Sequence, residues 1–115
     1  MKNFILALAI LFLTCTFAYG FESSISSGEK TSDAQVAIGN GAITAFEVIT
    51  DGTNDAKIII YDNTAASGKV LNEMTVIGGA HFGGREPMFP PEFYTGIYVD
   101  VSGTGASYIV EYKLR

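Results

Sequence analysis

From Ala34 onward, apolar and β-branched residues recur in short runs that are separated by glycine, asparagine and aspartate. The runs predict six strands, at residues 34–38, 42–50, 56–62, 69–77, 96–101 and 106–114. No window has the 3.6-residue periodicity of an amphipathic helix, and no segment repeats. We therefore expect an all-β chain that folds as a single small antiparallel β-sandwich or jelly-roll-like domain.

The segments between these runs have the composition of turns. Residues 51–55 (DGTND) predict a hairpin loop, because Asp, Gly and Asn tolerate the φ values of such turns. Residues 63–68 (NTAASG) predict the next turn, and residues 102–105 (SGTG) predict a last hairpin. In that hairpin, alternation predicts two apolar faces across from each other, formed by Ile97, Val99 and Val101 on one strand and by Tyr108, Val110 and Tyr112 on the other.

The first 20 residues have the layout of a secretory signal peptide. A basic start with Lys2 precedes ten apolar residues, 4–13, and small residues precede position 21. The apolar run is shorter than the about 20 residues that a transmembrane helix needs. We expect cleavage after Gly20 and a secreted, periplasmic or extracellular product. Residues 21–35 (FESSISSGEKTSDAQ) are polar and predict a flexible arm ahead of a β-sandwich domain at 36–115.

Charge and cysteine content narrow the range of partners. The chain has 12 acidic and 7 basic residues, and cleavage removes only Lys2, which leaves a formal charge of −6. Without a concentrated basic face, we expect no nucleic-acid partner and, after cleavage, no membrane partner. Cys15 is the only cysteine, so the mature chain can form neither a disulfide nor a thiolate zinc site.

The run Ile58-Ile59-Ile60-Tyr61 does not alternate between apolar and polar residues. A strand that is apolar on both sides is either central in the fold with a covered outer face or part of a subunit interface. With no helix predicted to cover a second face, these four residues are our candidate interface for a homo-oligomer or a larger protein assembly.

Residues 78–94 (GGAHFGGREPMFPPEFY) differ from the rest of the chain, because they contain all three prolines and the only histidine. One interpretation is an exposed recognition loop; the other is a crossover that folds its own aromatic residues into the core. For the first interpretation, the candidate binding residues are His81, Phe82, Arg85, Glu86, Phe89, Phe93 and Tyr94.

Catalysis, a metal site and a cofactor are not expected. His81 would have to serve any serine triad, and the chain has no G-x-S-x-G motif. Asp51, Asn54 and Asp55 could ligate calcium, but their spacing does not match an EF-hand loop and turn chemistry explains the same residues.

The last two-thirds of the chain, residues 41–112, resembles the small β-sandwich structural proteins of tailed-bacteriophage virions, which are head- or tail-associated. The likeness rests on the V-x-T-D-G-x-x-D-A turn at 48–56, the Y-D-N run at 61–63 and the G-I-Y-V-D-V-S-G-T-G segment at 96–105. It implies a non-enzymatic structural role with no catalytic residues. Together with the signal peptide, it implies an exported bacterial relative or an exported phage-encoded protein, with a place in the virion as one outcome.

Two functional hypotheses follow. The first is an exported structural or interaction protein that self-associates or decorates a larger assembly; in one version, residues 21–38 lend a strand to a neighbour's sheet edge. The alternative is a monomeric module that binds carbohydrate or a cell surface through residues 78–94. There, Phe82 and Tyr94 would stack on a sugar while Arg85 and Glu86 form hydrogen bonds.

Overall fold

The computed structural model describes residues 24–115, so the predicted signal peptide and the first three residues of the predicted arm lie outside it. The described strands are β1 (Ile25–Ser26), β2 (Ala34–Ile38), β3 (Gly41–Ile49), β4 (Ala56–Asp62), β5 (Lys69–Val76), β6 (Phe82–Arg85), β7 (Glu92–Phe93), β8 (Gly96–Ser102) and β9 (Ser107–Leu114). A single 3-10 turn, η1 (Gly78–Ala80), precedes β6. Within this part of the chain, no helix has the length and apolar character needed to span a membrane.

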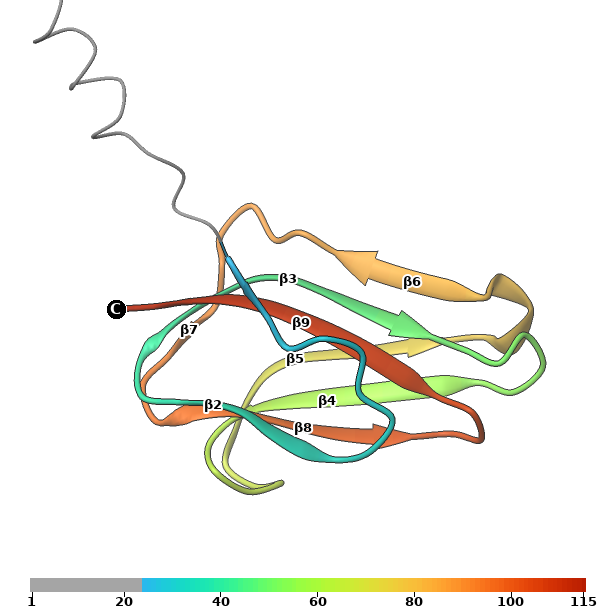
Figure 1. Ribbon diagram of the computed structural model, residues 1–115, viewed down its shortest axis with the longest axis horizontal. Coiled ribbons are helices and arrows are strands. Elements are labelled where there is room, and N and C mark those ends of the chain that lie inside the picture. Colours follow the sequence, from blue (N-terminus) through green and yellow to red (C-terminus); the bar gives the residue numbers. More distant parts are fainter. Residues whose placement is uncertain (1–23) are drawn as a thin grey trace, which may run out of the picture.

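The strands form two antiparallel sheets that lie face to face as two layers (Figure 1). One sheet has the order β1-β9-β3-β6, with β7 also paired to β3, and the other has the order β2-β8-β4-β5. This arrangement confirms the predicted small all-β sandwich. The six predicted strands are β2, β3, β4, β5, β8 and β9, each within one residue of its predicted bounds. The short strands β1, β6 and β7 were not predicted.

The core lies between the two layers and follows the predicted alternation. Ile97 and Val99 of β8 are fully buried, as are Tyr108 and Val110 of β9. Because β8 and β9 belong to different sheets, these side chains meet across the sandwich. Burying apolar side chains of this size stabilises the fold by about 1.5 to 3 kcal/mol each.

Two loops predicted as hairpins instead cross between the sheets. Residues 51–55 lead from β3 in one sheet to β4 in the other, and residues 103–106 lead from β8 to β9. The two crossings lie against each other, because a Cβ on Gly103 would come within 2.2 Å of the Asp55 carbonyl oxygen. Gly103 also has a φ of 115°, a backbone conformation that residues with a side chain rarely adopt. The turn at 63–68 does join two paired strands, β4 and β5, as predicted.

The segment predicted as a flexible arm pairs with the sandwich at two places, Ile25–Ser26 and Lys30. Ile25 and Ser26 pair with β9, and Lys30 bridges to Tyr108 with N–H···O distances of 2.9 Å in both directions. The Tyr108 hydroxyl donates to the Ser32 carbonyl at 3.0 Å, and burial raises the pKa of Tyr108 to about 12. The segment is polar because its backbone and side chains form hydrogen bonds with the outer edge of β9 instead of packing into the core.

Residues 34–38 likewise form β2 within the same chain, paired with β8. In the described fold this strand is therefore already bonded to its own sheet. The donor-strand version of the self-association hypothesis would require β1 and β2 to leave these positions.

Candidate interaction surface

A hydrogen-bonded corner fixes the start of β6. The Thr50 hydroxyl donates to the carbonyl oxygens of Gly78, at 2.9 Å, and His81, at 3.1 Å, and the Thr50 N–H also donates to His81 O at 2.7 Å. The Asp55 carboxylate accepts from the Gly78 N–H at 3.0 Å. A Cβ on Gly78 would lie 2.3 Å from the Thr53 carbonyl, so only glycine fits there. The corner therefore ties η1 to the β3–β4 loop and sets the position of β6.

Beyond this corner, the outer surface of the sheet is hollowed beside Gly84. The hollow has a volume of about 530 Å³ and lies over β3, β6 and β9. Phe82, Arg85 and Glu86 line one side, and Ile109 and Glu111 line the other. The missing side chain of Gly84 helps to leave this space open.

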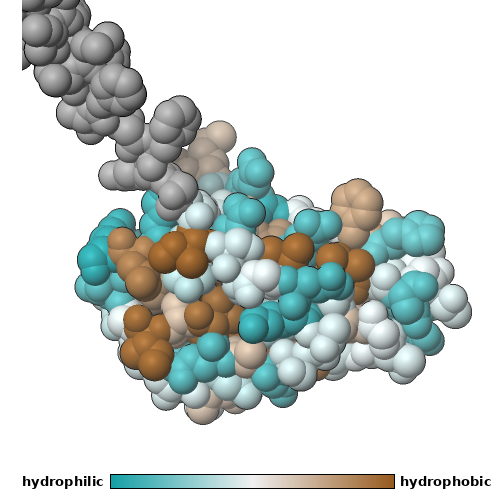
Figure 2. Space-filling view, in the orientation of Figure 1, coloured by the Kyte–Doolittle hydropathy of each residue, from teal (hydrophilic) through white to brown (hydrophobic). Residues whose placement is uncertain are grey.

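Large apolar side chains are exposed around β6. Apolar groups also interrupt the hydrophilic surface on the side of the molecule seen in Figure 2. Ile77, between β5 and η1, is 67% exposed, and Phe82, the first residue of β6, is 64% exposed. Just beyond its end, Met88 and Phe89 are 87% and 86% exposed, on a turn bounded by prolines. Exposed large apolar side chains along one segment make that segment a candidate interaction surface.

The structure divides the seven binding residues predicted from the sequence. Phe82, Arg85 and Glu86 lie together at the hollow, whereas His81 lies in the corner and Phe89 on the proline-bounded turn. Tyr94 is distant from Phe82: Phe82 pairs with Ile49 of β3, while Glu92, two residues before Tyr94, pairs with Ala42. The seven-residue separation along β3 corresponds to about 23 Å. Phe82 and Tyr94 therefore do not form one sugar-stacking site.

Phe93 belongs to the core, contrary to its prediction as a binding residue. It is fully buried, and its ring packs edge to face against Tyr112 with ring centroids 6.4 Å apart. Its position in β7, paired with Gly41, turns the ring into the space that Gly41 leaves open. Both interpretations of residues 78–94 are thus partly right, because the segment contributes one aromatic residue to the core and exposes others.

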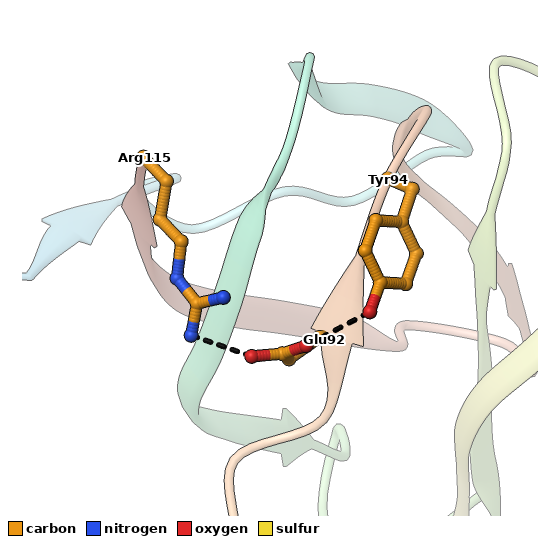
Figure 3. Close-up of polar contacts among 3 residues, drawn as sticks. All are labelled: Glu92, Tyr94 and Arg115. Carbon is orange, nitrogen blue, oxygen red and sulfur yellow. Dashed lines mark hydrogen bonds and ion pairs between the residues drawn. The ribbon is translucent and has the colours of Figure 1, made fainter.

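Tyr94 is exposed, but its hydroxyl is engaged. It donates to Glu92 Oε2 at 2.9 Å, and the other Glu92 oxygen forms an ion pair with Arg115 (Figure 3). These hydrogen bonds from Tyr94 and Arg115 lower the pKa of the Glu92 carboxyl, and the bond to Glu92 raises the pKa of Tyr94. These contacts link β7 to Arg115. They also engage the Tyr94 hydroxyl, the group that would otherwise form a hydrogen bond with a sugar.

The candidate interface on β4 is also divided. Ile58 and Ile60 are fully buried and point into the core, so only Ile59 and Tyr61 remain on the outer face. Ile59 lies opposite Glu73 on one neighbouring strand and Asp100 on the other. Two flanking carboxylates make this face a weak candidate for an apolar interface, since charged residues are depleted at interface cores.

The 51–55 loop is held by turn hydrogen bonds. Asp51 Oδ1 accepts from the N–H groups of Thr53, at 2.9 Å, and Asn54, at 2.7 Å. Together with the Asn54 side chain, these donors lower the pKa of the Asp51 carboxyl. Within residues 24–115, no group of three or more His, Cys, Asp or Glu side chains could hold a metal ion.

Several residues of this surface were not singled out from the sequence. Glu47, Ile109 and Glu111 come to the hollow from β3 and β9, which the sequence predicts only as strands. The exposed Ile77 was assigned to the end of a strand. The sequence signal that could have located this surface is the pair Gly83-Gly84, which lies between Phe82 and Arg85. Glycine within a strand often marks a place where another backbone approaches closely.

No protein-family model, no curated protein and no solved structure matches this chain.

Proposed function

We propose that this chain is a non-enzymatic, exported structural protein whose copies associate with one another, alone or as decoration on a larger assembly. The observation that carries the proposal is the apolar surface at the two ends of β6, formed by Ile77, Phe82, Met88 and Phe89. A small acidic domain that exposes four such side chains along residues 77–89 has a surface suited to another protein.

Two further features support this proposal. The first is the resemblance of residues 41–112 to phage virion structural proteins, whose function is assembly rather than catalysis. The second is the predicted signal peptide, which would deliver the protein to a compartment where a disulfide-free small domain gains stability from subunit contacts.

The mass of the purified protein tests the proposal. We expect light scattering on a sizing column to give a dimer or a larger species at micromolar concentration, in equilibrium with monomer on dilution. Ile59→Lys and Tyr61→Lys, on the outer face of β4, serve as comparison variants and should leave the mass unchanged. A monomer at every accessible concentration would contradict self-association; loss of assembly in either variant would return the interface to β4.

A further inference from the structure

The outer edge of β6 offers unpaired backbone groups. In the order β1-β9-β3-β6, β6 is the last strand, and within residues 24–115 no strand pairs with its other side. The Thr50 N–H donates to the His81 carbonyl, so His81 faces β3. Because hydrogen bonding alternates along an antiparallel strand, Gly83 and Arg85 also face β3. The N–H and C=O groups of Phe82 and Gly84 therefore point away from the sheet.

This edge contains neither a proline nor a bulge, two of the devices that prevent strand pairing, although the strand is short and ends in the charged Arg85. β6 pairs with β3 in an unbroken register over four residues, and its centre is Gly83-Gly84. Pro87 comes only after the strand has ended. Two glycines at the centre leave room for another backbone to approach closely.

Resting on the proposed function, we infer that β6 pairs antiparallel with β6 of a second copy, around a two-fold axis through Gly84. In a closed two-fold pair, residues that lie opposite each other must point to the same face, so the axis passes through a residue and its own symmetry mate. An axis at Gly84 places Phe82 opposite Glu86 of the second copy and Arg85 opposite its Gly83. An axis at Gly83 would instead place Arg85 opposite His81, which lies outside the strand and has a φ of 65°.

The register also explains why apolar groups lie at both ends of β6. The antiparallel direction brings the end of β6 in the second copy, with the exposed Met88 and Phe89 beyond it, to the start of β6, where Phe82 is exposed. By symmetry, the same contact forms at the other end. Each Phe82 also lies diagonal to Gly84 of the other copy, at the hollow that this glycine leaves open.

We assign the strand that pairs with the free edge of β6 to a second copy of this chain, because the groups that would contact each other all belong to the segment around β6. In an antiparallel pair of identical strands, the end of each β6 lies beside the start of the other, so exposed apolar residues near both ends come to the same side of the pair. Pairing at Gly84 would join the two five-stranded sheets into one continuous sheet across the axis. The exposed Phe82 of each subunit would then lie against the other copy.

A charge exchange across the predicted register tests the inference. Phe82 is exposed, so Phe82→Glu should fold normally while placing two carboxylates opposite each other at both ends of the pair. We expect sedimentation equilibrium of the full chain to show a dimer for the wild type. In Phe82→Glu, the dissociation constant should rise by about 100-fold, because each unfavourable pair occurs twice.

The double variant Phe82→Glu, Glu86→Lys should restore the dimer, because opposite charges would then face each other across the axis. Ile38→Glu is the matched control. Ile38 lies at the end of β2 and is about as exposed as Phe82, so this variant should remain dimeric. Assembly that persists unchanged in Phe82→Glu would overturn pairing at β6 while leaving the proposed function standing. Failure of the double variant to recover would overturn the register. A monomeric wild type would overturn both the inference and the self-association that it rests on.

Discussion

Phe93→Ala is expected to lower the free energy of unfolding by about 3 to 5 kcal/mol, the usual range for deleting a fully buried aromatic side chain. The ring has no exposed surface and packs against Tyr112 and over Gly41, so its removal leaves a cavity in the core. A loss of this size is a large part of the about 5 to 15 kcal/mol by which small domains are stable. Urea denaturation followed by circular dichroism measures the change.

Phe89→Ala provides the matched control, since it removes the same side chain four residues earlier, where the ring is 86% exposed. We expect its unfolding free energy to lie within about 0.5 kcal/mol of the wild type when the protein is monomeric. Equal effects of the two substitutions would show that residues 78–94 are not divided between core and surface as described.

Asp62→Ala should destabilise the fold by about 2 kcal/mol at neutral pH, the range for hydrogen bonds to a charged group. Asp62 Oδ1 accepts from the N–H groups of Tyr94, at 3.0 Å, Thr95, at 2.8 Å, and Gly96, at 3.3 Å. These bonds hold the start of β8 against the end of β4. Asp62→Asn keeps one acceptor oxygen, so we expect an intermediate loss.

The effect of Asp62→Ala should depend on pH. Burial alone would raise the pKa of the Asp62 carboxyl, but the three backbone donors together lower it below its ordinary value. A lowered pKa in the folded state means that the carboxylate stabilises the fold above its unfolded pKa of about 3.9. This contribution is lost as the pH falls through the folded value. The difference between wild type and Asp62→Ala should therefore shrink on acidification from pH 6 to below about pH 3; a constant difference would contradict it.

The sequence predicts the main strands well because their signal is local. Alternation within β8 and β9 identifies Ile97, Val99, Tyr108 and Val110 as core residues, and all four are fully buried. Glycine and aspartate between the runs mark where each strand ends. These features depend on neighbouring residues alone, and they hold whichever sheet the strand joins.

Pairing between strands is less predictable, because it depends on contacts far apart in the sequence. The loops at 51–55 and 103–106 have hairpin compositions, yet each crosses between layers about 10 Å apart, a distance that a few residues can span. The strand β6 contains two glycines and little β propensity, and it forms because β3 offers a free edge.

The same limit applies to the interaction surface. Phe82, Phe89 and Phe93 are identical in type and close in sequence, yet one lines the hollow, one lies on an exposed turn and one is in the core. The three phenylalanines differ in strand pairing: Phe82 and Phe93 pair with different parts of β3, and Phe89 lies outside any strand. Within the triple-isoleucine run, likewise, only the structure shows that Ile59 lies between Glu73 and Asp100.

Hydrogen exchange at the Gly84 amide, followed by NMR in the assembled wild-type protein, tests the central claim most directly. This N–H points away from β3, so a bond to a second copy is the protection that pairing at β6 would supply. We predict protection of about 100-fold or more in the wild type, and exchange near the unstructured rate in monomeric Phe82→Glu. An unprotected Gly84 amide in a protein that is fully assembled would contradict pairing at this edge.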